Sequence, residues 1–212
     1  MLDQVTVFTQ SSIRLAGSAT LYFDPFQMTF EPHDADAVLI THDHYDHFSP
    51  EDFRKVMRDD TVFAAPELLV PALEEAGIPR QQICPVAPGG NYTIAGVPVQ
   101  TVAAYNVSKP YHPREKGWVG YVADFDGMRY FVSGDTDRIP EHKGLACDVA
   151  LVPIGGTFTM DADEAAELIN ALAPKVAAIP THYGTIVGAP SDADRFAQLV
   201  DPRIPVVRKI VF

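Results

Sequence analysis

The stretch THDHYDHFSP, residues 41–50, places three histidines and two aspartates within seven positions. His42 and His44 are two residues apart, so both side chains point to one side if the preceding strand continues through them. Asp46 and His47 follow in the turn before the next helix. Neutral imidazole and carboxylate together suit Zn²⁺, and also Fe or Mn. The stretch is therefore either a histidine-rich polar turn or half of a metal site, whose missing ligands must come from elsewhere in the chain.

Three further apolar segments end in side chains that can bind or orient a metal ligand. LYF leads into Asp24, MRYFVSG into Asp135 and KVAAIPT into His182. Open α/β sheets assemble their sites beyond the carboxyl ends of strands, so we expect these residues to meet the histidine cluster. Asp135 is the natural bridge between two metals, and Asp24 is expected to accept the other N–H of a ligand histidine. Simple turn roles are the alternatives for both aspartates.

The composition is that of an ordinary globular protein. Its 212 residues are 47% hydrophobic and 21% charged, which predicts one domain over residues 1–212. A signal-peptide pattern is lacking and no apolar run approaches the ~20 residues of a membrane span, so we expect a cytoplasmic protein. The net charge of −12 argues against broad binding to nucleic-acid phosphates. Cys84 and Cys147 are expected to be separate buried thiols.

The pattern of apolar residues predicts a fold with many short strands and few helices. The chain opens with short β-branched and aromatic runs, and strand–helix alternation follows. This order favours an α/β fold, a four-layer sandwich in which two mixed sheets are flanked by helices. The expected strands are 4–10, 12–17, 19–24, 37–41, 61–65, 83–86, 92–96, 97–105, 118–125, 128–134, 148–154, 175–181 and 204–212. The expected helices begin at Ser49 and span 66–77, 161–174 and 191–201.

Three local signals support these boundaries. Ser49 followed by Pro50 is typical of a helix N-terminus. Asp161 can cap the helix 161–174, with an acid three residues on. The dipeptide Asp126-Gly127 predicts a tight hairpin between two strands.

The motifs THDHYDH, SGDTD and PTHYG, in this order and at these separations, resemble the metal-binding motifs of the metallo-β-lactamase superfamily. The match runs from LYFDP to PTHYG and so covers nearly the whole chain. Three other segments are similar to small single-domain hydrolases near the ascorbate-6-phosphate lactonase-like branch: LYFDPF, GWVGYVADFDGMRYFVSGDTD and LVPIGGTFTMDADEAAELI. The resemblance implies an αβ/βα sandwich and hydrolysis of an ester, lactone, amide or phosphodiester by metal-bound hydroxide.

The resemblance also implies a set of metal ligands. One metal would be held by His42 and His44, the second by Asp46, His47 and His182, and Asp135 would bridge them. Asp46 would also take part in proton transfer, so Asp46 and Asp135 are the expected catalytic residues. The cofactor would be one or two divalent transition metals, Zn²⁺ first, with Mn²⁺ or Fe as alternatives.

The sequence departs from the family pattern at one ligand. The family usually supplies a third histidine to the first metal from a loop before the bridging aspartate, but Asn106 stands where that histidine is expected. The nearest histidine is His112, six residues later. Either His112 reaches back to the first metal, or that site is weakened and the centre is mononuclear or asymmetric.

Two loops are expected to contact substrate. Lys109 and Arg114 lie in a locally basic loop, which is either a solvated surface or a lid that selects an anionic substrate together with Asn106. Gly156 and Thr157 follow an apolar strand and could present N–H groups to an oxyanion, unless they form only a tight turn. Tyr183, directly after a candidate ligand, could bind substrate or simply pack.

Three functions are compatible with these observations. The first is metal-dependent hydrolysis of a small, anionic ester, lactone or phosphodiester. The second is a nuclease, because two-metal sites also cleave RNA and DNA, but the acidic chain has no basic track. The third is a metal-binding protein without hydrolytic activity. We expect a small-molecule substrate and no membrane partner, and the sequence is compatible with a homo-oligomer.

Overall fold

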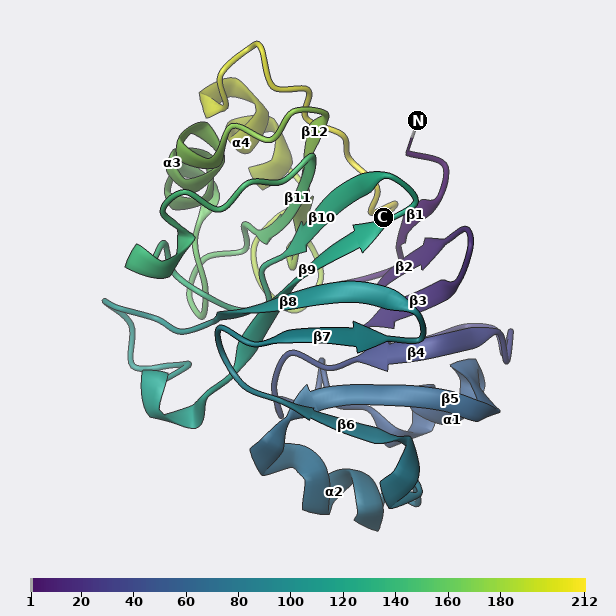
Figure 1. Ribbon diagram of the computed structural model, residues 1–212. Coiled ribbons are helices and arrows are strands. Elements are labelled where there is room, and N and C mark those ends of the chain that lie inside the picture. The colour runs from purple at the N-terminus through teal and green to yellow at the C-terminus, as the bar shows by residue number, and fades with distance from the viewer. Residues whose placement is uncertain (1) are drawn as a thin grey trace.

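Two six-stranded β-sheets pack face to face in the computed structural model, which describes residues 2–212 (Figure 1). The strand order is β1-β2-β3-β4-β5-β6 in the first sheet and β12-β11-β10-β9-β8-β7 in the second. Each sheet combines antiparallel pairs with parallel ones, and each has helices on its outer face. This is the predicted four-layer α/β sandwich of two mixed sheets.

The elements have the following bounds. The first sheet contains β1 (Val5–Val7), β2 (Ile13–Ala16), β3 (Thr20–Phe23), β4 (Ala35–Leu39), β5 (Met57–Pro66) and β6 (Ile83–Val86). The second contains β7 (Asn91–Ile94), β8 (Val97–Ala103), β9 (Val119–Phe125), β10 (Met128–Val132), β11 (Val149–Pro153) and β12 (Ala177–Thr181). The helices are α1 (Pro50–Val56), α2 (Val70–Glu75), α3 (Ala162–Leu172) and α4 (Asp192–Leu199). Short 3₁₀ turns occupy Glu67–Leu69, Arg80–Gln82, Arg114–Lys116 and Pro140–His142.

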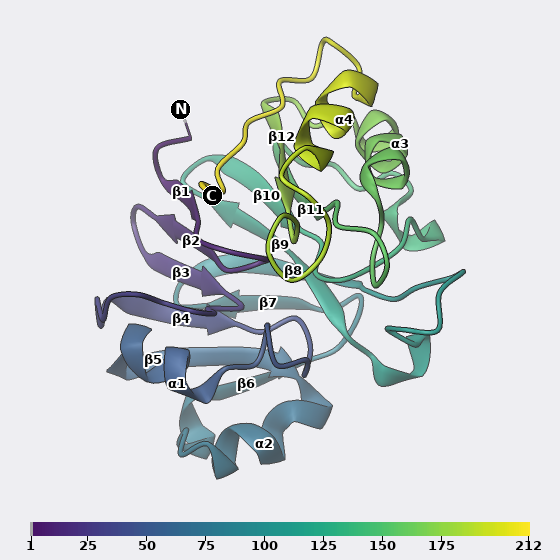
Figure 2. The same cartoon turned by 180° about the vertical axis from the view of Figure 1, so that it is seen from behind.

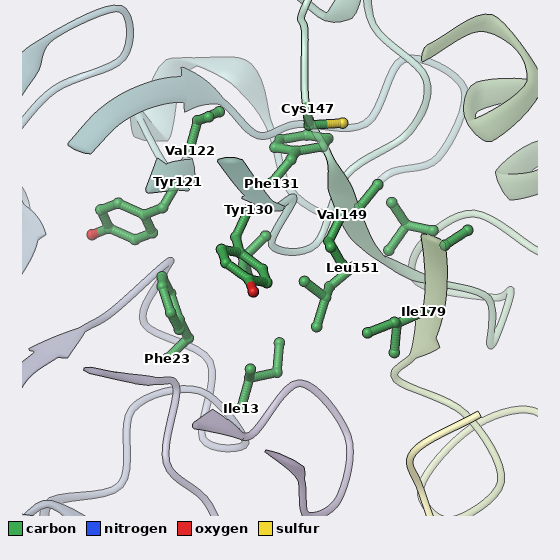
Figure 3. Packing of buried hydrophobic residues seen from close by; sticks show 14 of the residues in the cluster. Ile13, Phe23, Tyr121, Val122, Tyr130, Phe131, Cys147, Val149, Leu151 and Ile179 are labelled. Atoms are coloured by element: carbon green, nitrogen blue, oxygen red, sulfur yellow. The ribbon is translucent and has the colours of Figure 1, made fainter. Parts of the chain in front are cut away.

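Strand β3 shows why the apolar runs in this sequence are nearly continuous. Leu21 and Phe23 belong to the core between the sheets, whereas Tyr22 faces the helices outside the first sheet. A strand covered on both faces must be apolar at every position. Figure 3 shows Phe23 pointing toward Tyr121 and Tyr130 of the second sheet, and the rings of Phe23 and Tyr121 lie 6.0 Å apart.

The helix and hairpin signals of the sequence are confirmed. The Ser49 side chain accepts a hydrogen bond from the Asp52 backbone at the start of α1, and Asp161 forms a capping box with Glu164 at the start of α3. The hairpin between β9 and β10 turns at Asp126, with a φ of 48°, and at Gly127. Among residues 2–212 no helix is long and apolar enough to cross a membrane.

The prediction of a strand over 204–212 is wrong. This segment runs beside β12 (Figure 2), but it forms only an isolated bridge between Val206 and Ala178. The two ladder bonds are those around Ala178, and Pro205 has no N–H to donate an earlier one. The helix predicted over 66–77 is also shorter, since its first turn is 3₁₀ and α2 covers only Val70–Glu75.

A glycine in β9 makes room for the turn that follows β10. A Cβ at Gly120 would lie 2.5 Å from the Ser133 carbonyl oxygen and 2.8 Å from that of Val132. These atoms belong to the backbone and cannot rotate away. Any larger residue at position 120 must therefore displace the chain that leads into Asp135.

We expect Gly120→Ala to destabilise the fold by about 1–3 kcal/mol, as overpacked core positions do. The displaced turn carries Asp135, a candidate metal ligand, so the metal content of the purified protein should also fall. Urea unfolding and metal analysis measure the two effects. Gly90→Ala is the matched control, because its Cβ would meet only the Tyr92 ring, a side chain that can move. Equal stability of the two variants would contradict the steric argument.

Candidate metal centre

The candidate ligands gather at one edge of the sandwich because of the strand directions. Strands β3 and β4 run parallel in the first sheet, and β10, β11 and β12 run parallel in the second. Both β8 and β10 are antiparallel to β9, so β8 runs in the same direction as β10. A backbone hydrogen bond of 3.2 Å from Val119 to Thr41 joins the two sheets at the carboxyl ends of these strands.

The first group of candidate ligands contains His42, His44 and His112, whose ligand atoms all lie within 4.8 Å of one another. His112 therefore reaches back to the position that Asn106 leaves without an imidazole. The approach of His42 to His44 does not come from a continuing strand, since β4 ends at Leu39. The two rings instead meet in the loop after β4, with centroids 4.6 Å apart.

The second group contains Asp46, His47 and His182, again with ligand atoms within 4.8 Å of one another. His182 Nε2 lies 3.2 Å from Asp46 Oδ2, and His47 Nε2 lies 3.6 Å from the same oxygen. All three side chains are buried. The His182 backbone has a φ of 53°, in the left-handed region that few non-glycine residues adopt.

Asp135 lies between the two groups. Its Oδ2 is 3.3 Å from His112 Nε2 of the first group and 3.3 Å from His182 Nε2 of the second. Its Oδ1 is 3.4 Å from His47 Nε2. A carboxylate that approaches histidines of both groups has the placement that a bridging ligand requires.

The polar atoms at this centre fit a divalent transition metal. Nε2 of His42, His47 and His112 and Oδ1 of Asp135 are buried and have no hydrogen-bond partner. Buried polar atoms without a partner destabilise a fold unless a ligand satisfies them. Imidazole nitrogens and carboxylate oxygens that converge in this way are the donor set of Zn²⁺, Mn²⁺ and Fe sites.

The fully buried Asp24 carboxylate orients both groups of ligands. Its Oδ2 accepts hydrogen bonds from His47 Nδ1 at 2.7 Å and from the Thr41 hydroxyl at 2.6 Å. The Thr41 hydroxyl in turn accepts from His42 Nδ1 at 2.9 Å. Both rings therefore carry their proton on Nδ1 and direct Nε2 toward the centre, which is the form a metal ligand needs.

His112 is oriented by a backbone carbonyl. Its Nδ1 donates to the Phe158 carbonyl at 3.1 Å, and Asn106 Nδ2 donates to the same oxygen at 2.7 Å. Asn106 N also donates to the His112 carbonyl at 2.9 Å. Asn106 thus shapes the loop that carries His112 and does not line the site cavity, so its contact with substrate stays a prediction.

Three residues at the centre have roles that the sequence did not reveal. Thr41 carries the hydrogen-bond relay from Asp24. Trp118 is buried behind the first group, with its ring 5.0 Å from that of His42. Asp137 accepts hydrogen bonds from the backbone of Val107 and Ser108 and so anchors the loop of His112. The second aspartate of SGDTD was the one available signal for this role.

The charges at the centre set the protonation of its imidazoles. Burial lowers the pKa of His42 well below its usual value and also lowers that of His44, so both rings are neutral. Burial also lowers the pKa of His47, but the carboxylates of Asp135 and Asp24 outweigh it and raise that pKa well above its usual value. Without a metal, a proton on His47 supplies the positive charge that stabilises the carboxylates of Asp135 and Asp24.

Comparison with known proteins identifies the family. Residues 4–182 match the model of a beta-lactamase superfamily domain. A UPF0173 metal-dependent hydrolase of Thermoplasma acidophilum is 35% identical over 171 residues, which cover 77% of this chain and 72% of the relative. A UPF0173 metal-dependent hydrolase of Methanosphaerula palustris is 33% identical over 199 residues, which cover 89% of this chain and 87% of the relative. The chain belongs to the UPF0173 metal-dependent hydrolases.

Solved structures agree with this assignment. A metal-dependent hydrolase from Parabacteroides distasonis is 29% identical, with a TM-score of 0.79 and coverage of 98% of this chain and 93% of that one. The metallo hydrolase Igni18 from Ignicoccus hospitalis is 25% identical, with a TM-score of 0.78 and coverage of 96% and 93%. This UPF0173 protein is accordingly a metal-dependent hydrolase of the metallo-β-lactamase superfamily.

The basic loop of this UPF0173 hydrolase is not a free cationic lid. Lys109 Nζ lies 2.7 Å from Asp137 and 2.9 Å from Glu164, so its charge is neutralised by two acids. Arg114 pairs with Glu141 at 2.8 Å. Neither Lys109 nor Arg114 lines the cavity at the metal centre, and their role in substrate binding stays a prediction.

The glycine loop and Tyr183 also have structural roles. A Cβ at Gly155 would lie 2.3 Å from the His182 carbonyl oxygen, so the glycine permits the loop after β11 to pass closely beside a ligand. The Gly156 N–H donates to the Met160 carbonyl and is not free for an oxyanion. Thr157 is exposed, and Tyr183 is buried against Phe212, with the rings 5.4 Å apart. Gly156, Thr157 and Tyr183 do not line the cavity, and their contact with substrate stays a prediction.

We expect Asp24→Asn to lower the affinity for Zn²⁺ by about 10–100-fold, because the orienting charge behind the ligand histidines is lost. Thr41→Val should weaken one of the two sites more than the other, since it interrupts only the relay to His42. Competition with a chromogenic chelator resolves the two binding steps. Asp36→Asn is the control, because Asp36 accepts similar hydrogen bonds from Thr20 and Arg58 away from the centre. Unchanged affinity in Asp24→Asn would refute the relay.

The raised pKa of His47 predicts that Zn²⁺ binding depends on pH around neutrality. The proton on His47 must leave before the metal binds, so the apparent affinity falls about tenfold per pH unit below that pKa. Because this pKa lies above the usual value near 6.5, the affinity should still be rising between pH 7 and pH 8. Titration calorimetry of the metal-free protein at several pH values measures the slope. Affinity that is flat from pH 6.5 to pH 8 would show that His47 is already neutral.

Proposed function

We propose that this hydrolase uses two divalent transition metals to hydrolyse an ester, lactone or phosphodiester bond in a small molecule. The observation that carries the proposal is the position of Asp135, within 3.3 Å of a histidine nitrogen in each of the two ligand groups. We expect Zn²⁺, with Mn²⁺ or Fe as the alternatives. The first metal would be held by His42, His44 and His112, the second by Asp46, His47 and His182, with Asp135 between them.

When bound, a pair of such ions lowers the pKa of water and supplies a hydroxide nucleophile near neutral pH. The protein side chains place and orient the reacting groups around it. Asp46 and Asp135 line the cavity, so substrate and catalytic carboxylates share one space. Burial raises the pKa of Asp46, but His182 and His47 outweigh it and lower that pKa, so Asp46 is ionised and can accept a proton.

The anionic substrate expected from the sequence loses its basis at this site. It rested on Lys109 and Arg114, and both are held in ion pairs with acidic side chains. The lactone and ester parts of the proposal rest on the metal centre alone and are unaffected. The resemblance to the ascorbate-6-phosphate lactonase-like branch suggests lactones as test substrates, whereas the cavity lining, within residues 2–212, offers no lysine or arginine to a charged one.

We expect dipicolinate to abolish hydrolysis of an ester and lactone panel, and added Zn²⁺ or Mn²⁺ to restore it. Asp46→Asn should lower kcat by about 10²–10⁴-fold, because it removes a proton acceptor and a ligand charge. His182→Ala should remove activity together with one equivalent of metal.

Stopped assays with parallel metal analysis separate catalysis from metal loss. His33→Ala is the control, since His33 is exposed and its ring bonds to the Met57 carbonyl, which belongs to neither ligand group. Full activity of Asp46→Asn, or activity that survives complete removal of metal, would overturn the proposed function.

A further inference from the structure

The metal centre opens into a cavity of about 410 Å³ whose walls differ sharply from its floor. The floor consists of the candidate ligands His44, Asp46, His112, Asp135 and His182. The walls are mostly apolar and come from separate loops: Tyr45 after β4, Tyr111 after β8, Phe158 after β11 and Ile186 after β12. These four side chains border the space through which the floor is reached.

Three of the wall residues are unusually exposed for apolar side chains. The exposed fraction is 65% for Tyr45, 42% for Tyr111 and 41% for Ile186. Eight large apolar side chains among residues 2–212 are exposed, so three of the eight border this one cavity. Exposed apolar groups gathered around a concave site indicate a ligand that covers them.

The aromatic side chains of the wall pack against other rings. The Tyr111 ring packs edge-on against Phe158, with centroids 4.8 Å apart. The Tyr45 ring packs edge-on against the buried Phe26 at 5.9 Å. These contacts fix the rings as walls before substrate binds, which reduces the ordering cost of binding.

The side chains of the cavity wall offer no cationic partner to an anionic group that lies away from the metals. Within the described residues, the lining contains no lysine or arginine. Asp43, exposed at the cavity, adds a negative charge beyond those of the candidate ligands. An anion seated against the walls would lose hydration without gaining a cationic partner, which is costly.

We propose that the substrate presents an uncharged apolar group, such as an alkyl or aryl chain, to the wall formed by Tyr45, Tyr111, Phe158 and Ile186. This inference rests on the proposed hydrolytic function and names the class of substrate it acts on. The reacting ester or lactone carbonyl reaches the floor while the apolar chain lies along the wall. The wall therefore selects neutral substrates over anionic ones of the same length.

The decisive experiment compares 4-nitrophenyl esters with the zinc-loaded protein. From acetate to butyrate, kcat/KM should rise about fourfold per methylene, the equivalent of ~0.8 kcal/mol of apolar burial. The pentanoate ester should exceed the glutarate monoester, which has the same length and one negative charge, by roughly tenfold or more. A flat dependence on chain length, or preference for the glutarate monoester, would overturn the inference.

Two variants of one wall residue sharpen the test. Ile186→Ser should flatten the dependence on chain length, and Ile186→Lys should shift preference toward the glutarate monoester. Leu68→Ser is the matched control, because Leu68 is 43% exposed but lies away from this cavity. If Leu68→Ser changed selectivity as much as Ile186→Ser, the wall would not be the cause.

A binding measurement separates this inference from the proposed function. The Ile186 methyl resonance should shift with N-methylpentanamide and not with glutaramate, in both the metal-free and the zinc-loaded protein. If no ester is hydrolysed, ester hydrolysis fails as the function, while the methyl shifts still decide the inference. Shifts with the neutral amide alone support an apolar site, and shifts with glutaramate alone overturn it.

Discussion

The metal centre depends on one buried carboxylate, that of Asp24. A carboxylate without solvent is stable only when its oxygens accept hydrogen bonds, and Asp24 accepts them from the Thr41 backbone, the Thr41 hydroxyl and His47. The same bonds set the orientation of His47 directly and of His42 through Thr41. Because Asp24 follows β3 and its partners follow β4, the parallel register that pairs Phe23 with Leu39 fixes the ligand geometry. The parallel register of β3 and β4 is therefore part of the fold and also sets the geometry of the site.

The loop of His112 is held by a second set of charges. Asp137 accepts from the loop backbone and pairs with Lys109, which also pairs with Glu164 at the start of α3. These contacts link the ends of β8 and β10 to a helix far away in sequence. The basic residues of the loop therefore stabilise the position of a metal ligand. The local excess of positive charge beside the metal centre therefore has a structural role.

Much of the centre was predictable, because local motifs combine with a simple rule of topology. The cluster at 42–47, Asp135 and His182 meet because strands that run in one direction end at one edge. The position of His112 was not predictable, since it depends on a left-handed φ of 54° and on hydrogen bonds to Phe158. The ion pairs of Lys109 also join residues far apart in the chain. The segment 204–212 has the composition of a strand, but only the fold shows that it forms a single bridge.

The metal ligands and the residues of the cavity wall lie on the same loops, but different contacts fix their positions. Tyr45 lies between two ligands in sequence, and Tyr111 directly precedes His112. The ligand rings are oriented from behind, by Asp24, Thr41 and the backbone of Phe158, and these contacts involve no wall side chain. Phe158 shows the division within one residue, since its carbonyl orients His112 while its ring lines the cavity. Side chains of the wall can therefore change the substrate that fits without disturbing the atoms that hold the metals.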